Sequence, residues 1–84
     1  MPKITFKDNP LTQEYEAKAK NLLKGELKRR GVTYAQLVEK LGALGVQETE
    51  RNLANKISRG RFRAGFFTQC LSAIGARTLR LEEP

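Results

Sequence analysis

The segment GVTYAQLVEKLG constrains the fold more than any other part of the chain. Thr33 and Gln36 have the T-x-x-Q spacing of a capping box, in which each side chain bonds the backbone N–H of the other residue. Val32 before this cap and Leu37 after it are placed to pack together as a hydrophobic staple. The apolar residues that follow recur at helical spacing, and glycines close the segment. The sequence therefore predicts a short amphipathic helix over residues 34–44.

Three further helices are predicted around this one, over residues 11–30, 49–58 and 64–74. Asn9 followed by Pro10 suits the start of the first helix, and Gly31 suits its end. The first helix carries an apolar stripe made of Tyr15, Ala19, Leu22, Leu23 and Leu27. We expect an all-α fold, with residues 1–84 forming one compact four-helix domain. Short terminal β-strands are candidates at residues 3–6 and 77–82, because Leu79 and Leu81 alternate with polar residues.

The charge is positive and unevenly distributed. Lysine and arginine number 16 against 9 acidic residues, which gives a net charge of +7 and a pI near 10.0. A pI above about 9 on a compact domain is typical of nucleic-acid binding. Positive residues gather in KGELKRR and again across residues 51–63, which hold five positive side chains and no carboxylate. A polyanionic partner is therefore expected.

Other classes of function find little support in the sequence. There is no histidine, and the single cysteine, Cys70, lies on an apolar face without a neighbouring base. No phosphate-binding glycine loop and no Cys/His cluster occurs. We therefore expect no enzyme activity, no cofactor, no metal site and no small-molecule substrate. No apolar run approaches the roughly 18 residues of a membrane-spanning helix, so a cytoplasmic protein is expected, associated with the nucleoid if the source is bacterial.

The order of the predicted elements points to one class of DNA-binding unit. A helix pair joined by a glycine-containing turn is the helix-turn-helix arrangement, whose second helix lies in the major groove. The segments ELKRRGVTYAQLVEKLG, RNLANKISRG and FFTQCLSAIG together resemble the phage-repressor and Cro-type (lambda-repressor-like) helix-turn-helix domain. The chain also resembles a set of small bacterial domains of unassigned function. The turn GALGVQET is longer than the family's, which predicts a longer or differently tilted recognition helix.

The resemblance implies a set of DNA contacts when positions are counted back from Gly60. Arg51, Asn52 and Lys56 hold the positions at which members of the family contact base edges, and Asn55 lies beside Lys56. Arginine, lysine and asparagine also have the hydrogen-bonding groups that read guanine and adenine. Tyr34 matches a common phosphate contact, with Thr33 next to it. Arginines in a loop are suited to bind backbone phosphates, so phosphate contacts are also expected from Arg59, Arg61 and Arg63. The same surface is extended by Lys28, Arg29 and Arg30.

These residues predict a small transcriptional regulator that binds duplex DNA specifically as a homodimer, with the terminal strands as a candidate dimer contact. Three alternatives stay open. The polar face of residues 49–58 is also what an ordinary solvated helix presents. Arg61-Phe62-Arg63 suits an RNA or single-strand binder that stacks a base on Phe62, although a core role for this ring is favoured, as for Phe66 and Phe67. An antitoxin-like module that binds an acidic protein is the third alternative.

Overall fold

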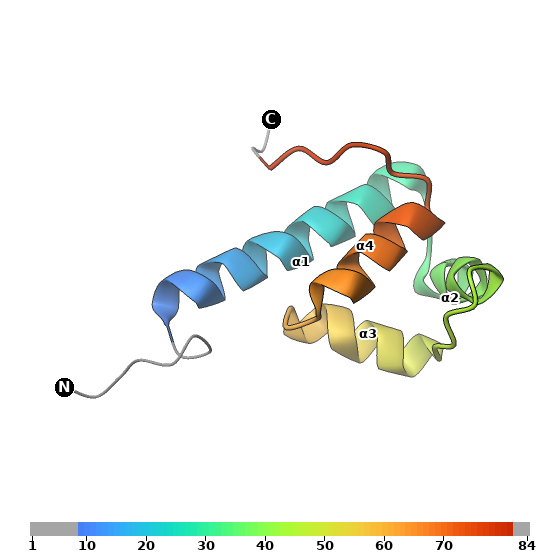
Figure 1. Cartoon of the computed structure of the whole chain (residues 1–84), viewed down its shortest axis with the longest axis horizontal. Helices are drawn as coiled ribbons and strands as arrows, with labels where there is room; N and C mark the ends of the chain where they lie inside the picture. Colours follow the sequence, from blue (N-terminus) through green and yellow to red (C-terminus); the bar gives the residue numbers. More distant parts are fainter. Residues whose placement is uncertain (1–8, 82–84) are drawn as a thin grey trace.

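A computed structural model describes residues 9–81, which form four helices and no strand (Figure 1). The helices are α1 (Pro10–Arg30), α2 (Tyr34–Ala43), α3 (Glu50–Arg59) and α4 (Ala64–Ala73). Each helix begins and ends within one residue of the bounds expected from the sequence. The all-helical fold is confirmed.

Local capping explains where these helices begin. Asn9 accepts a hydrogen bond from the backbone N–H of Leu11 at 2.9 Å, ahead of Pro10 at the first position of α1. Both bonds of the capping box are present, because Thr33 Oγ1 accepts from the N–H of Gln36 and the Gln36 side chain accepts from the N–H of Thr33. Such a cap stabilises a helix by about 1 kcal/mol.

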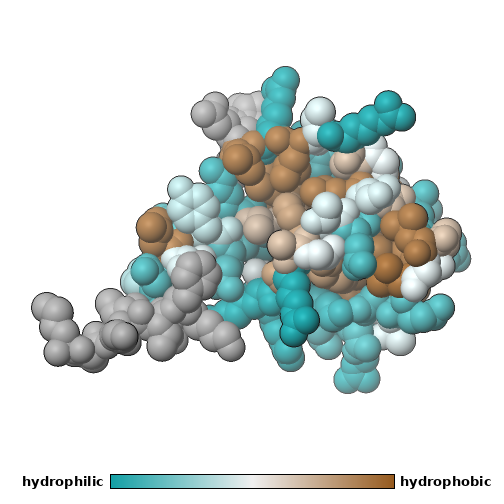
Figure 2. All heavy atoms as spheres, viewed as in Figure 1, coloured by the Kyte–Doolittle hydropathy of each residue, from teal (hydrophilic) through white to brown (hydrophobic). Residues whose placement is uncertain are grey.

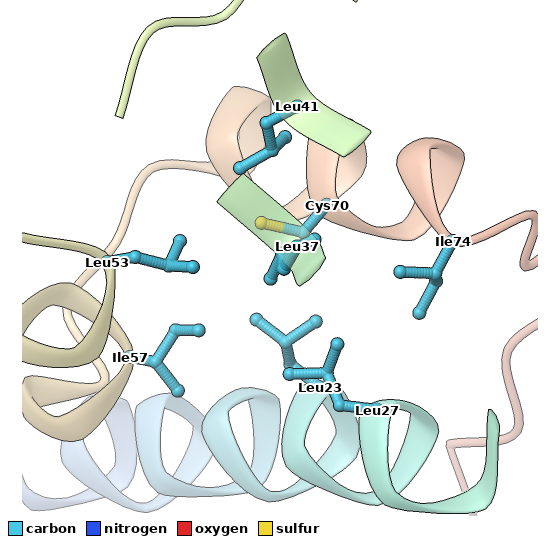
Figure 3. Packing of buried hydrophobic residues seen from close by; sticks show 8 residues of the cluster. All are labelled: Leu23, Leu27, Leu37, Leu41, Leu53, Ile57, Cys70 and Ile74. Atoms are coloured by element: carbon cyan, nitrogen blue, oxygen red, sulfur yellow. The ribbon is translucent and has the colours of Figure 1, made fainter. Parts of the chain in front are cut away.

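The core is assembled from a few side chains on every helix (Figure 3). Leu37 and Leu41 of α2 face Leu53 of α3 and Cys70 of α4, and all four side chains are fully buried. The remaining members are Leu23, Leu27, Ile57 and Ile74. Burying one such side chain contributes about 1.5–3 kcal/mol, so packing rather than intrinsic helix propensity holds the helices in place.

The first turns of α1 lie outside this core. They extend beyond the ends of α3 and α4 (Figure 1), and Leu11 and Tyr15 are 58% and 61% exposed. The apolar stripe expected along the whole of α1 is therefore buried only in its second half, at Leu23 and Leu27. The physical reason is length, since α1 has 21 residues and each of the other helices has 10.

The predicted C-terminal strand is not found in residues 77–81. This segment forms no ladder, Leu79 is half-buried and Leu81 is 62% exposed. Alternating apolar residues become a strand only where a second strand takes up their backbone hydrogen bonds, and none of the described residues does so. The candidate strand at 3–6 and residue 82 lie outside the described residues. Within residues 9–81, none of the helices has the length and apolar character needed to cross a membrane.

Candidate nucleic-acid interface

The outward face of α3 carries most of the predicted base-contacting residues. Thr49 caps this helix by accepting a hydrogen bond from the N–H of Asn52 at 3.1 Å. Leu53 and Ile57 are fully buried against the other helices. Because the buried residues recur at i and i+4, the intervening polar residues point outward: Arg51, Asn52 and Asn55 are all exposed. Figure 2 shows hydrophilic side chains along the edge of the molecule where α3 runs in Figure 1.

Lys56 differs from its neighbours on α3. Its ammonium group donates a hydrogen bond to Glu48 Oε1, in the turn before α3. The Glu48 side chain is only 8% exposed, whereas that of Lys56 is 48% exposed. The Lys56 Nζ also lies 4.9 Å from the centre of the Phe66 ring of α4, within cation–π range. Lys56 therefore ties α3 both to the preceding turn and to α4.

The loop after α3 places three arginines beside these residues. Gly60 ends α3 in the left-handed conformation, with φ of 71°. Arg59 is exposed, and Arg61 Nε lies 3.7 Å from Glu16 Oε1 of α1 while its side chain stays 56% exposed. Arg63 occupies the N-cap position of α4, where its side chain makes no capping bond. These arginines lie at the C-terminal end of α3 and carry guanidinium groups of the kind that bind phosphates.

An open groove of about 550 Å³ lies between the end of α3 and the start of α4. Its charged lining is Lys56, Arg61 and Arg63 together with the carboxylate of Glu48, and Phe62 and Phe66 form apolar walls. The ring of Phe62 is itself packed at 5.6 Å from that of Phe67 and 5.7 Å from that of Phe66. The expected core role of Phe62 is thus confirmed, and its two neighbouring rings also pack against the core.

The other predicted phosphate-contacting residues lie outside α3 and the loop after it. Lys28, Arg29 and Arg30 lie in the last turn of α1, at the end of the molecule away from α3 in Figure 1. Glu26 accepts hydrogen bonds from Arg29 and Arg30 at 3.0 and 3.2 Å, so these two guanidinium groups are partly neutralised. At the start of α2, Thr33 acts as the cap and Tyr34 is half-buried against the core. The structure therefore does not bring the α1 cluster together with α3.

Two carboxylates pair with the predicted contact residues, and the sequence analysis did not predict either pairing. Glu26 is 8% exposed, and its spacing of three and four residues to the two arginines is a helical pairing pattern that could have predicted the contact. Glu48 lies eight residues from Lys56, and no local pattern indicates that pair.

The remaining titratable group of interest, Cys70, is buried beneath this site. Burial, and to a smaller extent the nearby Glu48, raise the pKa of the Cys70 thiol, while Lys56 lowers it, and together they move this pKa from 9.0 to about 12. A thiol with such a pKa stays protonated at neutral pH and is a poor nucleophile. The described residues contain no group of three or more His, Cys, Asp or Glu side chains that could hold a metal ion.

The fold and this surface define a small all-helical domain with a positively charged edge built on α3 and the loop that follows it. Residues 15–79 match the model of the family described as "Domain of unknown function (DUF6471)". The chain belongs to this family. No curated protein and no solved structure matches it.

Proposed function

We propose that this protein binds double-stranded DNA through α3 and acts as a small transcriptional regulator. One observation carries the proposal. α3 buries Leu53 and Ile57 and presents Arg51, Asn52 and Asn55 to solvent. Arginine donates to the O6 and N7 acceptors of guanine, and asparagine bonds adenine bidentately, so these side chains suit the edges of bases in the major groove.

The surroundings of α3 add the positive charge that DNA binding requires. Arg59, Arg61 and Arg63 follow the helix, and residues 51–63 contain no carboxylate. Arg61 and Arg63 both line the groove at the start of α4, and their guanidinium groups suit them to bind a phosphate there. The resemblance of α2 and α3 to the lambda-repressor-like helix-turn-helix pair supports the same docking, with Tyr34 and Thr33 near the backbone at the start of α2.

Lys56 has a different part in this proposal from the one that the sequence suggested. Its ammonium is already bonded to Glu48 and rests on the Phe66 ring. We assign it the role of fixing α3 against α4, so that Arg51, Asn52 and Asn55 are presented in one orientation. The rival function, in which Phe62 stacks on a single-stranded base, loses support because the rings of Phe66 and Phe67 already pack against Phe62.

Fluorescence anisotropy with labelled duplex DNA at several salt concentrations tests the proposal. We expect log affinity to fall linearly with log salt, with a slope of about −0.9 for each phosphate contacted. Arg51→Ala should weaken binding and reduce the preference among sequences. The matched control is Arg77→Ala, which removes the same charge at an exposed position after α4 and should change binding much less. Equal effects of the two substitutions, or no binding at low salt, would refute the proposal.

A further inference from the structure

We propose that the exposed first half of α1 is a docking surface on which a second copy of this chain binds antiparallel to the first. The surface is defined by Leu11, Tyr15 and Ala19 of α1 together with Gly60 and Phe62 of the loop after α3. These residues line a mostly apolar groove of about 420 Å³. The proposal concerns self-association, so it stands independently of DNA binding.

The exposed apolar residues of this surface indicate that it binds a partner. Leu11 and Tyr15 are one helical turn apart and are among the most exposed large hydrophobic residues of the described chain. Single exposed apolar residues are ordinary, but adjacent ones beside an apolar groove mark interaction surfaces. The groove also has room for such side chains, because Ala19 and Gly60 on its lining are small.

The charges along α1 identify the partner as a second copy. At 3.6 residues per turn, Glu14 and Lys18 lie on one edge of the apolar stripe, and Glu16 and Lys20 lie toward the other edge. The second pair is engaged within the chain, because Glu16 lies 3.7 Å from Arg61 Nε and Lys20 Nζ donates to Ser58 O at 3.1 Å. Glu14 and Lys18 remain exposed.

This arrangement is self-complementary in one direction only. In an antiparallel pair related by a two-fold axis, Glu14 of each copy meets Lys18 of the other, so the same favourable contact forms twice. In a parallel pair, the two-fold axis runs along the helices and exchanges their edges, so Glu14 and Lys18 would instead face the partner's Glu16 and Lys20, which are already engaged within their own chain. The Lys18 ammonium already lies along the stripe, 5.8 Å from the centre of the Tyr15 ring, where it can reach across such an interface.

The symmetry has a consequence for the position of α3. In the antiparallel pair, the two-fold axis is perpendicular to the plane that contains the two α1 helices. Equivalent edges of the two helices therefore lie on the same side of that plane. The edge that carries Glu16 and Lys20 contacts the end of α3 and the loop after it. Both copies of α3 therefore lie on one side of the dimer, as recognition of a two-fold symmetric DNA site requires.

Sedimentation equilibrium of the full chain without DNA, from about ten to several hundred micromolar, tests this surface. We expect the mass to rise with concentration from 9.5 kDa toward twice that value. Tyr15→Lys should raise the dimer dissociation constant by about tenfold or more, as loss of a central aromatic contact does. Leu44→Lys is the matched control, because Leu44 is 53% exposed on the turn after α2, and it should leave the dissociation constant unchanged.

A charge exchange tests the contact between Glu14 of one copy and Lys18 of the other. Glu14→Lys alone and Lys18→Glu alone should each weaken self-association, because each puts like charges opposite one another. Mixing the two variants should restore association, since every contact in the mixed dimer again joins opposite charges. A mass of 9.5 kDa at every concentration would overturn the proposal. Association that persists in Tyr15→Lys, or variants that fail to associate when mixed, would also overturn it.

Discussion

The pair formed by Glu48 and Lys56 makes a strong prediction about stability. Lys56→Met would remove the partner of a carboxylate whose side chain is only 8% exposed. Leaving a buried charge unpaired costs about 3–5 kcal/mol when both partners are buried. Lys56 is 48% exposed, so water reaches this pair and reduces the cost, while loss of the contact with Phe66 adds about 0.5–1 kcal/mol. We expect Lys56→Met to lower the free energy of unfolding by about 2 kcal/mol.

A double-mutant cycle separates this pair from nonspecific effects. Glu48→Gln removes the carboxylate charge but keeps a hydrogen-bonding side chain, so its cost should be smaller, about 1 kcal/mol. Lys56→Met in the Glu48→Gln background should cost much less than in the wild type, because no unpaired charge remains. The difference between the two backgrounds should reach about 1 kcal/mol, beyond the scatter of independent sites.

Urea unfolding followed by circular dichroism at the helical band measures all four proteins. Lys24→Met is a suitable control because Lys24 is exposed on α1, and its effect should stay within about 0.5 kcal/mol. If Lys56→Met is no more costly than Lys24→Met, or if the two substitutions at the pair are additive, Lys56 does not anchor α3. Its side chain would then be free to read bases, as the sequence alone suggested.

Two further predictions concern the core and a turn. Mainly because of burial, the pKa of Cys70 rises from 9.0 to about 12 on folding, so the folded state holds the thiol proton more tightly than the unfolded state. The contribution of this proton to the free energy of unfolding is fully present below pH 9 and is lost as the pH rises toward 12. The fall in unfolding free energy above pH 9 should thus be steeper in the wild type than in Cys70→Ala, and equal slopes would contradict the assignment. Gly60→Ala should destabilise the protein by about 1–2 kcal/mol, because Gly60 has a φ of 71° and an added Cβ would lie 3.4 Å from the backbone oxygen of Glu16. Gly45→Ala, with a φ of 91° and open space around the Cβ, should cost less in the same urea assay, and a larger loss there would contradict the packing argument.

The sequence predicted those parts of the fold that depend on local interactions. Thr33 and Gln36 form both bonds of the expected capping box, and Gly31 and Gly60 end α1 and α3 in the left-handed conformation. These features are readable because the interacting groups lie within four residues of one another, where helical geometry alone fixes their relative positions.

Features that depend on tertiary packing were not predictable in the same way. The apolar stripe of α1 gave no indication that Tyr15 lies beyond the end of the core, because that depends on where α3 and α4 stop. The predicted strand at residues 77–82 rested on alternation alone, which cannot supply a pairing partner. Lys56 was assigned to base contact by the family resemblance, counting back from Gly60, whereas the contact that restrains it comes from Glu48 in the preceding turn.

Nuclear magnetic resonance of the 15N-labelled protein during titration with duplex DNA tests the central claim most directly. We predict that the amide shifts will change most for residues 50–63, which comprise α3 and the loop that carries Arg61 and Arg63, with smaller changes at the start of α2. The last turn of α1, which carries Lys28, should change little. Shifts concentrated at that end of α1, or no shifts in α3 at a DNA excess, would contradict the account.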